Sequence, residues 1–308
     1  MTDTRRKLYP EIEPYETGML DVGEGHSLYY ERVGTPGAKP AVFLHGGPGG
    51  GMAPDHRRQW DPELYDVLLF DQRGCGKSLP FAEIEHNDTW RIVEDIERLR
   101  EMCGHQKWQA FGGSWGSTLA LAYAQKYPDR VSELVLRGVF LARQQEKSWL
   151  YDYGASEIMA EQWDAFTGLI PEAERGDLVR AYYNRLTSED EATRLAAARE
   201  WSLWEGHVAT LLPNEDLLEG FGDPAKAVPF ARICAKFFLE NFFYHLHQSL
   251  QKNLQKYQRK NLKNQSYQNP LFLLLHFQML HDQNCHSFVF FQNCLLYTSD
   301  AADEGLGV

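Results

Sequence analysis

Residues 108–127 read WQAFGGSWGSTLALAYAQKY, and this stretch decides the fold. A short apolar run is followed by the pattern G-x-S-x-G, from Gly112 to Gly116, and then by an alanine- and leucine-rich segment long enough for a helix. This pattern exposes a nucleophilic serine when it lies between a strand and a helix. The flanking glycines permit a sharp, strained turn, and the helix N-terminus favours developing negative charge. We predict that Ser114 is a catalytic nucleophile; a serine in an ordinary glycine-rich turn is the alternative.

The segments before this stretch predict an α/β fold. Residues 18–34 alternate polar and apolar side chains around GEG, which indicates a β-hairpin. Two buried strands, AVFL (41–44) and DVLLF (66–70), each end at a glycine-rich loop, and a helix is expected from residue 89 to 102. Another strand, ELVLRG, follows at 133–138. Such alternation is typical of a mostly parallel sheet with helices on both faces.

The chain divides into three parts by composition. Residues 1–143 predict the front part of the α/β core, and residues 144–230 contain helical patterns without strand-like runs, which indicates an inserted helical cap. In residues 231–308 the pattern is disrupted, because asparagine and glutamine become dense beyond about residue 243 and no glycine occurs between Gly222 and Gly305. Strand-to-helix turns need glycine and aspartate. We therefore predict that the late strands are missing or non-native.

Two explanations remain open for this tail. It is either a polar helical subdomain or a translated frameshift, and its inconsistency with the preceding residues favours the frameshift. The final segment CLLYTSDAADE (294–304) resembles a translated adaptor used in preparing sequencing libraries, which supports the same hypothesis.

Two glycine-rich loops accompany the serine. A tetrahedral intermediate needs waiting N–H donors, and we predict that Trp115 supplies one and that Gly47, in HGGPGGG (45–51), supplies the other. His45 is expected to be structural, because it precedes Ser114, whereas folds with this serine motif place the catalytic base last in the sequence. The second loop, DQRGCGKS (71–78), imitates a phosphate loop, but Asp71 occupies the position of its first glycine. We expect a structural turn, with a possible ion pair between Asp71 and Arg73.

Bulk properties limit the partners and the location. The 308 residues carry a formal net charge of −12, which argues against affinity for nucleic acid or anionic membranes. The five scattered cysteines suit a reducing compartment, so we predict a cytoplasmic protein, and neither a signal peptide nor a membrane anchor is evident. A metal site is not expected, because the candidate ligands are irregularly spaced: His245, His247, His281, Cys285 and His286.

The chain resembles the proline iminopeptidases, a branch of the α/β-hydrolases, in HGGPGGG, DQRGCGKS and GGSWGSTLALAYAQKYP. The similarity extends from about Tyr9 to about Phe243 and includes REWSLWEG and PFARI. The resemblance implies an α/β-hydrolase fold and a peptide substrate, whose N-terminal proline is released through a Ser/Asp/His triad and an acyl-enzyme without metal or cofactor. It also implies that Glu205 holds the substrate amine. A second glutamate is expected where Cys234 stands, and Glu240 is the nearby candidate to replace it.

The triad acid and histidine are not identifiable. The segments resembling GRYD and GHS that the family implies are absent, and Asp282 and His286 are too close in sequence to occupy separate strand ends. Three functional hypotheses therefore stand: a prolyl aminopeptidase, another serine esterase or amidase of the same fold, and a non-catalytic product of a damaged reading frame. The sequence does not indicate an oligomeric state.

Overall fold

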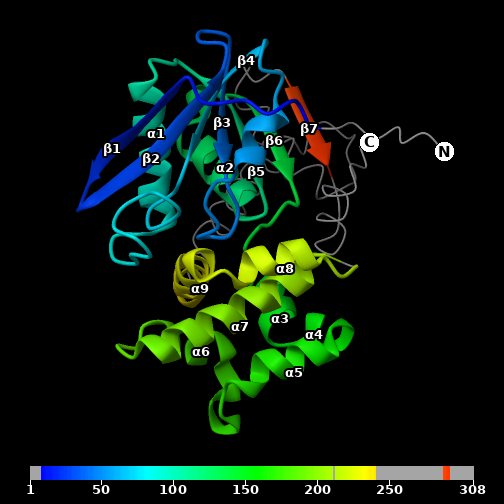
Figure 1. The fold of residues 1–308 in the computed structure, drawn as a ribbon. Coiled ribbons are helices and arrows are strands. Elements are labelled where there is room, and N and C mark those ends of the chain that lie inside the picture. Colours follow the sequence, from blue (N-terminus) through cyan, green and yellow to red (C-terminus); the bar gives the residue numbers. More distant parts are fainter. Residues whose placement is uncertain (1–7, 211, 241–286, 292–308) are drawn as a thin grey trace, which may run out of the picture.

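The computed structural model describes residues 8–210 and 212–240, together with the backbone of residues 287–291 (Figure 1). These residues form a seven-stranded sheet in the order β1-β2-β4-β3-β5-β6-β7. Only the pairs β1·β2 and β2·β4 are antiparallel, so the predicted mostly parallel sheet is confirmed. The strands are β1 (Glu16–Gly23), β2 (His26–Gly34), β3 (Lys39–Leu44), β4 (Tyr65–Phe70), β5 (Trp108–Gly113), β6 (Val131–Arg137) and β7 (Ser287–Phe291).

The helices fall into two groups. One group packs on the sheet, and the other forms a helical cap at the carboxyl ends of the parallel strands. Two of them, α1 (Thr89–Met102) and α2 (Trp115–Lys126), belong to the core. The helical cap of residues 144–239 contains α3 (Gln144–Tyr151), α4 (Ala155–Ile158), α5 (Ala160–Gly168), α6 (Leu178–Leu186), α7 (Glu191–Ala209), α8 (Glu215–Gly222) and α9 (Pro224–Leu239). Short 3₁₀ helices are η1 (Pro54–Gln59), η2 (Pro128–Arg130) and η3 (Glu172–Asp177).

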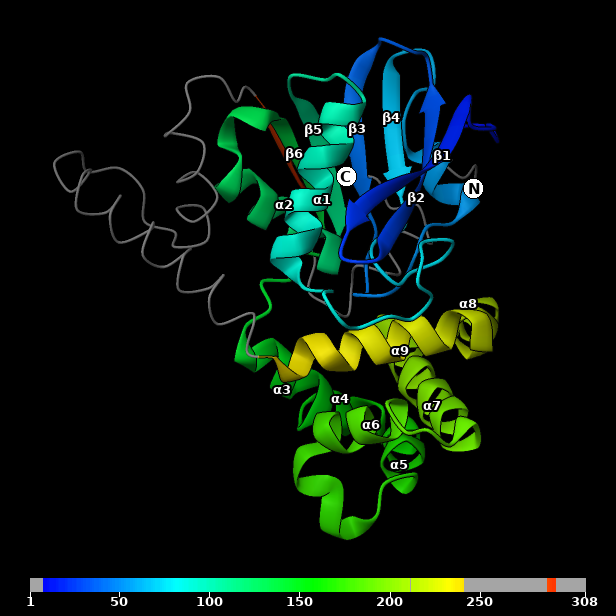
Figure 2. The same cartoon turned by 90° about the vertical axis from the view of Figure 1, so that its left-hand side faces the viewer.

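The two faces of the sheet are covered differently. Side chains alternate between faces along a strand, and Val42 and Leu44 pack with α1 and α2 in the main core. The intervening Ala41 and Phe43 join Trp60, just after η1, in a smaller cluster on the opposite face. Figure 2 shows α1 and α2 together on one side of the sheet. Within the described residues, helices therefore cover one face and η1 with its flanking loop covers the other, so the expected helices on both faces are not seen there.

Local sequence signals account for the outer elements. The Asp88 side chain caps α1 by accepting a hydrogen bond from the backbone N–H of Arg91 at 3.0 Å, and Gly104 just past the helix takes a φ of +71°. An aspartate cap at its start and a left-handed glycine just past its end are local signals that account for the bounds of this predicted helix. The β1–β2 hairpin is also confirmed.

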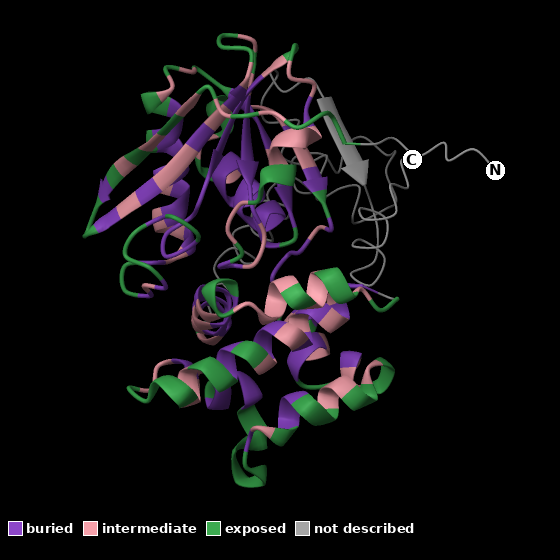
Figure 3. Ribbon diagram, in the orientation of Figure 1, coloured by how far each residue is buried: buried purple, intermediate pink, exposed green. Residues whose placement is uncertain are grey.

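The helical cap lies below the carboxyl ends of the parallel strands, and α9 is its contact with the core (Figures 1 and 2). A Cβ atom placed on Gly49 would lie 2.8 Å from Cα of Phe230, so α9 packs directly on the first glycine-rich loop. Figure 3 shows buried residues concentrated in the central strands and on the inner faces of the cap helices. Because α9 continues unbroken to Leu239, the predicted domain boundary at residue 230 falls inside a helix, and the cap ends later than expected.

The tail contributes one strand to the described structure. β7 pairs in parallel with β6, from Glu133↔Ser287 to Arg137↔Phe291. The described residues thus include a late strand that we expected to be missing or non-native; its origin in a shifted reading frame stays a prediction. Asp282, His286 and the other predicted tail ligands lie outside the described residues. No described helix has the length and apolar character required to cross a membrane.

Candidate active site

The G-x-S-x-G segment forms a tight connection between β5 and α2. Ser114 has φ = 52° and ψ = −122°, a combination that only glycine adopts readily, and its side chain is exposed at the carboxyl edge of the sheet. A Cβ atom on Gly112 would lie 2.1 Å from the carbonyl oxygen of Gly116, and one on Gly116 would lie 2.0 Å from that of Leu44. Both glycines are therefore required by close backbone packing, as well as by the turn.

The first glycine-rich loop runs beside the serine. A Cβ atom on Gly46 would lie 3.7 Å from the Cβ atom of Ser114, and Gly47 adopts φ = 120°. Gly47 lines the same cavity as Ser114, and Trp115 begins α2 directly after the serine. The two residues predicted to supply oxyanion N–H groups are thus brought to the serine from two different elements.

A buried hydrogen-bond network joins these two elements, and the sequence analysis missed it. The Gln72 side chain accepts from Trp115 Nε1 at 3.0 Å and donates to the His45 carbonyl at 3.0 Å. The backbone N–H of Gln72 donates to His45 Nε2, while His45 Nδ1 faces the Gly46 carbonyl at 2.9 Å. Burial lowers the pKa of His45 to about 4. His45 is therefore a neutral ring hydrogen-bonded through both nitrogens, which fits its predicted structural part.

The second loop, DQRGCGKS, is a structural turn, but its expected ion pair is wrong. Arg73 is buried and pairs with Asp95 on α1, with Nε to Oδ2 at 2.6 Å. The Asp71 carboxylate instead accepts the backbone N–H groups of Met52 at 2.7 Å and Lys77 at 2.8 Å. Asp71 thereby ties the two glycine-rich loops together. The two side chains of the expected pair therefore have different partners: Arg73 pairs with a carboxylate on α1, and Asp71 accepts backbone N–H groups.

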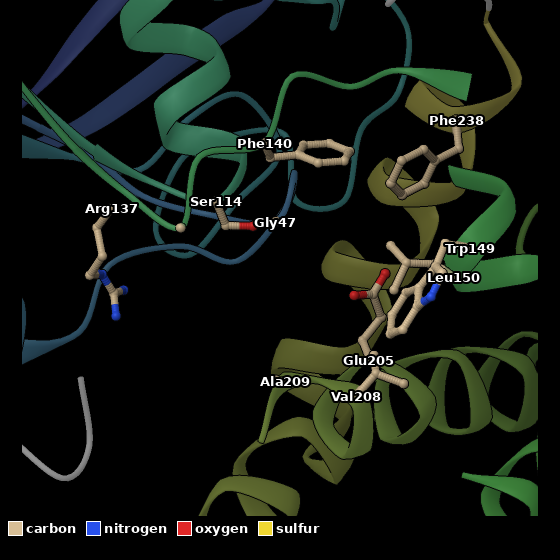
Figure 4. Close-up of a pocket in the computed structure, with 11 residues that line it drawn as sticks. Gly47, Ser114, Arg137, Phe140, Trp149, Leu150, Glu205, Val208, Ala209 and Phe238 are labelled. Carbon is tan, nitrogen blue, oxygen red and sulfur yellow. The ribbon is translucent and has the colours of Figure 1, made fainter. Parts of the chain in front are cut away.

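A cavity of about 180 Å³ opens between the sheet edge and the cap. Figure 4 shows Ser114 and Gly47 on the core side, with Glu205, Trp149 and Phe238 facing them from the cap. Most of the wall is apolar, as is usual for pockets that take small ligands. The lining residues are Gly47, Ser114, Arg137, Gly138, Phe140, Trp149, Leu150, Glu205, Val208, Ala209 and Phe238.

Glu205 enters this cavity from α7 with a distinctive set of neighbours. Its Oε1 accepts a hydrogen bond from the hydroxyl of Tyr151 on α3 and lies 3.8 Å from Sγ of Cys234 on α9. Burial raises the pKa of Glu205 to about 7, although the two neighbouring donors oppose the shift. Cys234, which stands where the family resemblance implies a second glutamate, is thus in contact with Glu205.

Glu240 lies elsewhere. It is the C-terminal cap residue of α9, half-exposed, and pairs with Lys236 at 3.4 Å. It is not among the residues that line the cavity, so the suggestion that it replaces the missing carboxylate finds no support in this geometry.

The described residues supply no evident general base. The ring of His56 accepts the N–H of Ala53 through Nδ1, and burial lowers its pKa to about 4. Both ring nitrogens of His45 already have hydrogen-bond partners, as described above. Within the described part of the chain, no group of three or more histidine, cysteine or acidic residues is arranged to hold a metal ion.

Comparison with known proteins identifies the family. Residues 39–216 match the alpha/beta hydrolase fold family. The proline iminopeptidase of Xylella fastidiosa is 50% identical over 251 residues, which is 82% of this chain and 80% of that protein. The Arabidopsis thaliana and Xanthomonas citri proline iminopeptidases are also 50% identical, over 82% and 80% of this chain and 67% and 78% of their own lengths. This chain belongs to the proline iminopeptidase family.

Membership of this family confirms the predicted family and the α/β-hydrolase fold. Among the residues that sequence reasoning missed are Arg137, which lines the cavity, and Tyr151, which contacts Glu205 from behind the cavity wall. Arg137 had a usable signal, because it ends a buried parallel strand next to β5, and such strand ends share one edge of the sheet. Tyr151 had none, since its contact with Glu205 depends on how two cap helices pack.

Proposed function

We propose that this protein is a serine aminopeptidase that releases N-terminal proline from peptides through an acyl-enzyme. The observation that carries the proposal is that Ser114, on the strained elbow, and Glu205, a half-buried carboxylate from the cap, line one cavity. The names of the relatives, proline iminopeptidases at 50% identity, support the same substrate. We also propose, from cysteine usage, that the protein is cytoplasmic.

In this proposal Glu205 fixes the substrate by its amine. An ionised carboxylate attracts the protonated prolyl nitrogen, and the apolar wall strengthens this charge-assisted hydrogen bond by excluding water. Phe140, Phe238 and Leu150 border the space that the pyrrolidine ring would occupy. Holding the amine at a fixed distance from Ser114 orients the scissile carbonyl for attack.

Bond cleavage then follows in two steps. Ser114 Oγ attacks the prolyl carbonyl carbon and gives its proton to a general base, and the backbone N–H groups of Gly47 and Trp115 stabilise the oxyanion. The peptide nitrogen leaves with the proton that the base took from Ser114, and water then hydrolyses the prolyl ester, which releases proline and regenerates the Ser114 hydroxyl. The base and its acidic partner stay unassigned in the described part of the chain.

The test is hydrolysis of a prolyl-aminomethylcoumarin reporter by the full chain, its Ser114→Ala variant, and a chain whose tail is replaced by that resequenced from genomic DNA. Activity that disappears with Ser114→Ala supports the proposal. If only the chain with the replaced tail is active, the damaged reading frame is supported too. If the full chain and the chain with the replaced tail are both inactive, although both are folded and Ser114 is accessible, the peptidase proposal fails.

The runner-up is an esterase or amidase acting on a neutral acyl group. Discrimination between the prolyl reporter and its N-acetylated form separates the two, because a neutral-ester hydrolase has no use for a carboxylate at Glu205. Equal rates with both reporters would favour the runner-up.

A further inference from the structure

The two carboxylate oxygens of Glu205 have different surroundings. Oε1 accepts a hydrogen bond from the hydroxyl of Tyr151 and lies 3.8 Å from Sγ of Cys234. Both of these residues are fully buried, and neither lines the cavity. Glu205 does line it, and Figure 4 shows its carboxylate directed from α7 into the space between the cap and Ser114. The polar contacts that the described residues make to this carboxylate all fall on Oε1, so Oε2 is the oxygen left for a ligand.

The ring of Tyr151 is held in place by aromatic side chains. Trp201 stacks on it at a centroid distance of 4.7 Å, Phe238 meets it edge-on at 5.3 Å, and Phe166 lies 6.3 Å away. Such packing fixes the orientation of the ring, so the hydroxyl cannot turn away from Oε1. Burial also raises the pKa of Tyr151 well above its usual range. The phenol therefore stays protonated and is a permanent donor to Glu205.

The occupied oxygen limits what Glu205 offers to an amine. A carboxylate has about four acceptor positions, shared equally between its two oxygens, and the hydroxyl and the thiol take those of Oε1. A ligand ammonium therefore meets one open oxygen. A secondary ammonium, such as that of an N-terminal proline, places one N–H on Oε2 and keeps one more, whereas a primary ammonium keeps two more. In a mostly apolar cavity, each additional N–H without a partner costs free energy.

We propose that Tyr151 is a positioning residue which, by holding Oε1, makes Glu205 select secondary amines over primary amines. This inference rests on the proposed function, because it takes Glu205 as the amine site. It narrows the substrate class to peptides whose N-terminal nitrogen carries a ring or an N-alkyl group.

Two isomeric ligands test this selection. N-methylalanine and 2-aminobutyric acid contain the same atoms, and each has all but one of the side-chain ring carbons of proline, but the first is a secondary amine and the second a primary amine. Full-length protein carrying Ser114→Ala, which prevents acylation, is titrated by calorimetry with their aminomethylcoumarin amides. The N-methylalanyl amide should bind about threefold to tenfold more tightly. Adding Tyr151→Phe frees Oε1 for a second N–H and should bring the two dissociation constants to within about twofold.

The matched control is Tyr182→Phe. Tyr182 is also a buried tyrosine of the cap, and its hydroxyl donates to the backbone carbonyl of Phe166 at 2.6 Å. It is not among the residues that line the cavity. Loss of this hydroxyl should leave the ratio of the two affinities unchanged, which distinguishes release of Oε1 from a general loosening of the cap.

Glu205→Gln gives a second readout, which a purely structural contribution of Tyr151 does not produce. The Tyr151 hydroxyl should hold the amide oxygen, so that the amide N–H₂ group faces the cavity and cannot accept from an ammonium. This variant should then bind prolyl-aminomethylcoumarin no more tightly than the N-acetylated form. Adding Tyr151→Phe lets the amide turn its oxygen toward the cavity and should restore a preference of about threefold for the free amine.

The outcomes separate this inference from the proposed function. If the parent binds the two isomers equally, or Tyr151→Phe leaves their ratio unchanged, this inference is wrong and the amine site stands. A preference for the free prolyl ligand that persists in Glu205→Gln also contradicts it, and this comparison holds even if Tyr151→Phe is unstable. If the parent binds the prolyl ligand and its N-acetylated form equally, the amine site of the proposed function fails, and this inference fails with it. Absence of binding by every ligand to folded protein overturns both.

Discussion

Replacing Glu205 with glutamine should weaken substrate binding and stabilise the folded protein at the same time. Glutamine keeps the oxygen that accepts from Tyr151 and nearly the same shape, but it removes the charge. Loss of one partner from a buried charged pair costs about 2–5 kcal/mol. Since Glu205 is partly reached by solvent, we take the lower end, about 2 kcal/mol, which corresponds to roughly a 30-fold loss in kcat/KM.

The pH dependence of activity follows from the same carboxyl. Amine binding requires ionised Glu205, and its pKa is raised by burial to about 7. The kcat/KM of the parent should therefore fall as pH drops below about 7, and the Glu205 contribution to this acid limb should be absent from the Glu205→Gln profile, which keeps only the limb of the general base. N-acetylated substrates should show neither the Glu205 contribution nor the 30-fold loss. Tyr151 and Cys234 face Glu205, and burial raises the pKa of both far above this range, so neither produces the limb.

The effect on stability has the opposite sign. A raised acid pKa means that the folded state binds the proton more tightly than the unfolded state, so stability falls as pH rises from about 4.5 through about 7. A shift of this size corresponds to up to about 3 kcal/mol above pH 7. Glu205→Gln should therefore unfold at higher denaturant concentration than the parent at pH 8 and at a similar concentration at pH 4.5. Equal unfolding midpoints at pH 8, measured by fluorescence, would refute the buried-carboxylate reasoning, and this result does not depend on catalysis.

Two further predictions concern stability, measured by urea unfolding. Gly116→Ala should destabilise the fold by more than about 3 kcal/mol, because its Cβ atom would lie 2.0 Å from a backbone carbonyl of β3, whereas Gly168→Ala meets nothing within 4 Å and should change little. Asp95→Asn should cost about 3–5 kcal/mol, because it leaves the buried Arg73 without its main partner. The control Asp55→Asn, at a pair whose acid is 68% exposed, should cost under about 1 kcal/mol.

The elbow could be predicted from sequence because its determinants are local. The two glycines around Ser114 are demanded by contacts with neighbouring backbone, and those contacts follow whenever a strand turns directly into a helix on a parallel sheet. The hairpin and the capped helix α1 were predictable for the same reason. Each depends on residues a few positions apart, where glycine and aspartate have fixed conformational preferences.

Longer-range partners were not predictable. Asp71 and Arg73 are two residues apart and of opposite charge, yet Arg73 pairs with Asp95 from α1 and Asp71 binds backbone N–H groups. Adjacent charges in a turn point in directions that the sequence does not specify. Glu205 was equally ambiguous, because a glutamate in a cap helix is usually exposed. Only the packing of α3 and α9 against α7 places it beside Tyr151 and Cys234.

Two energetically costly features of the described residues, the strained backbone of Ser114 and the raised pKa of Glu205, occur at one place, which is independent support for the position of the site. Five non-glycine residues in the described chain have a positive φ, so the strain at Ser114 does not by itself mark function. A carboxyl whose pKa is raised to about 7 is also not unique to active sites. However, the strained serine and this carboxyl come from different layers of the fold and face one cavity. Sequences usually depart from the rules of stability where function requires it, and two unrelated departures meeting in one cavity are explained by a single reaction there.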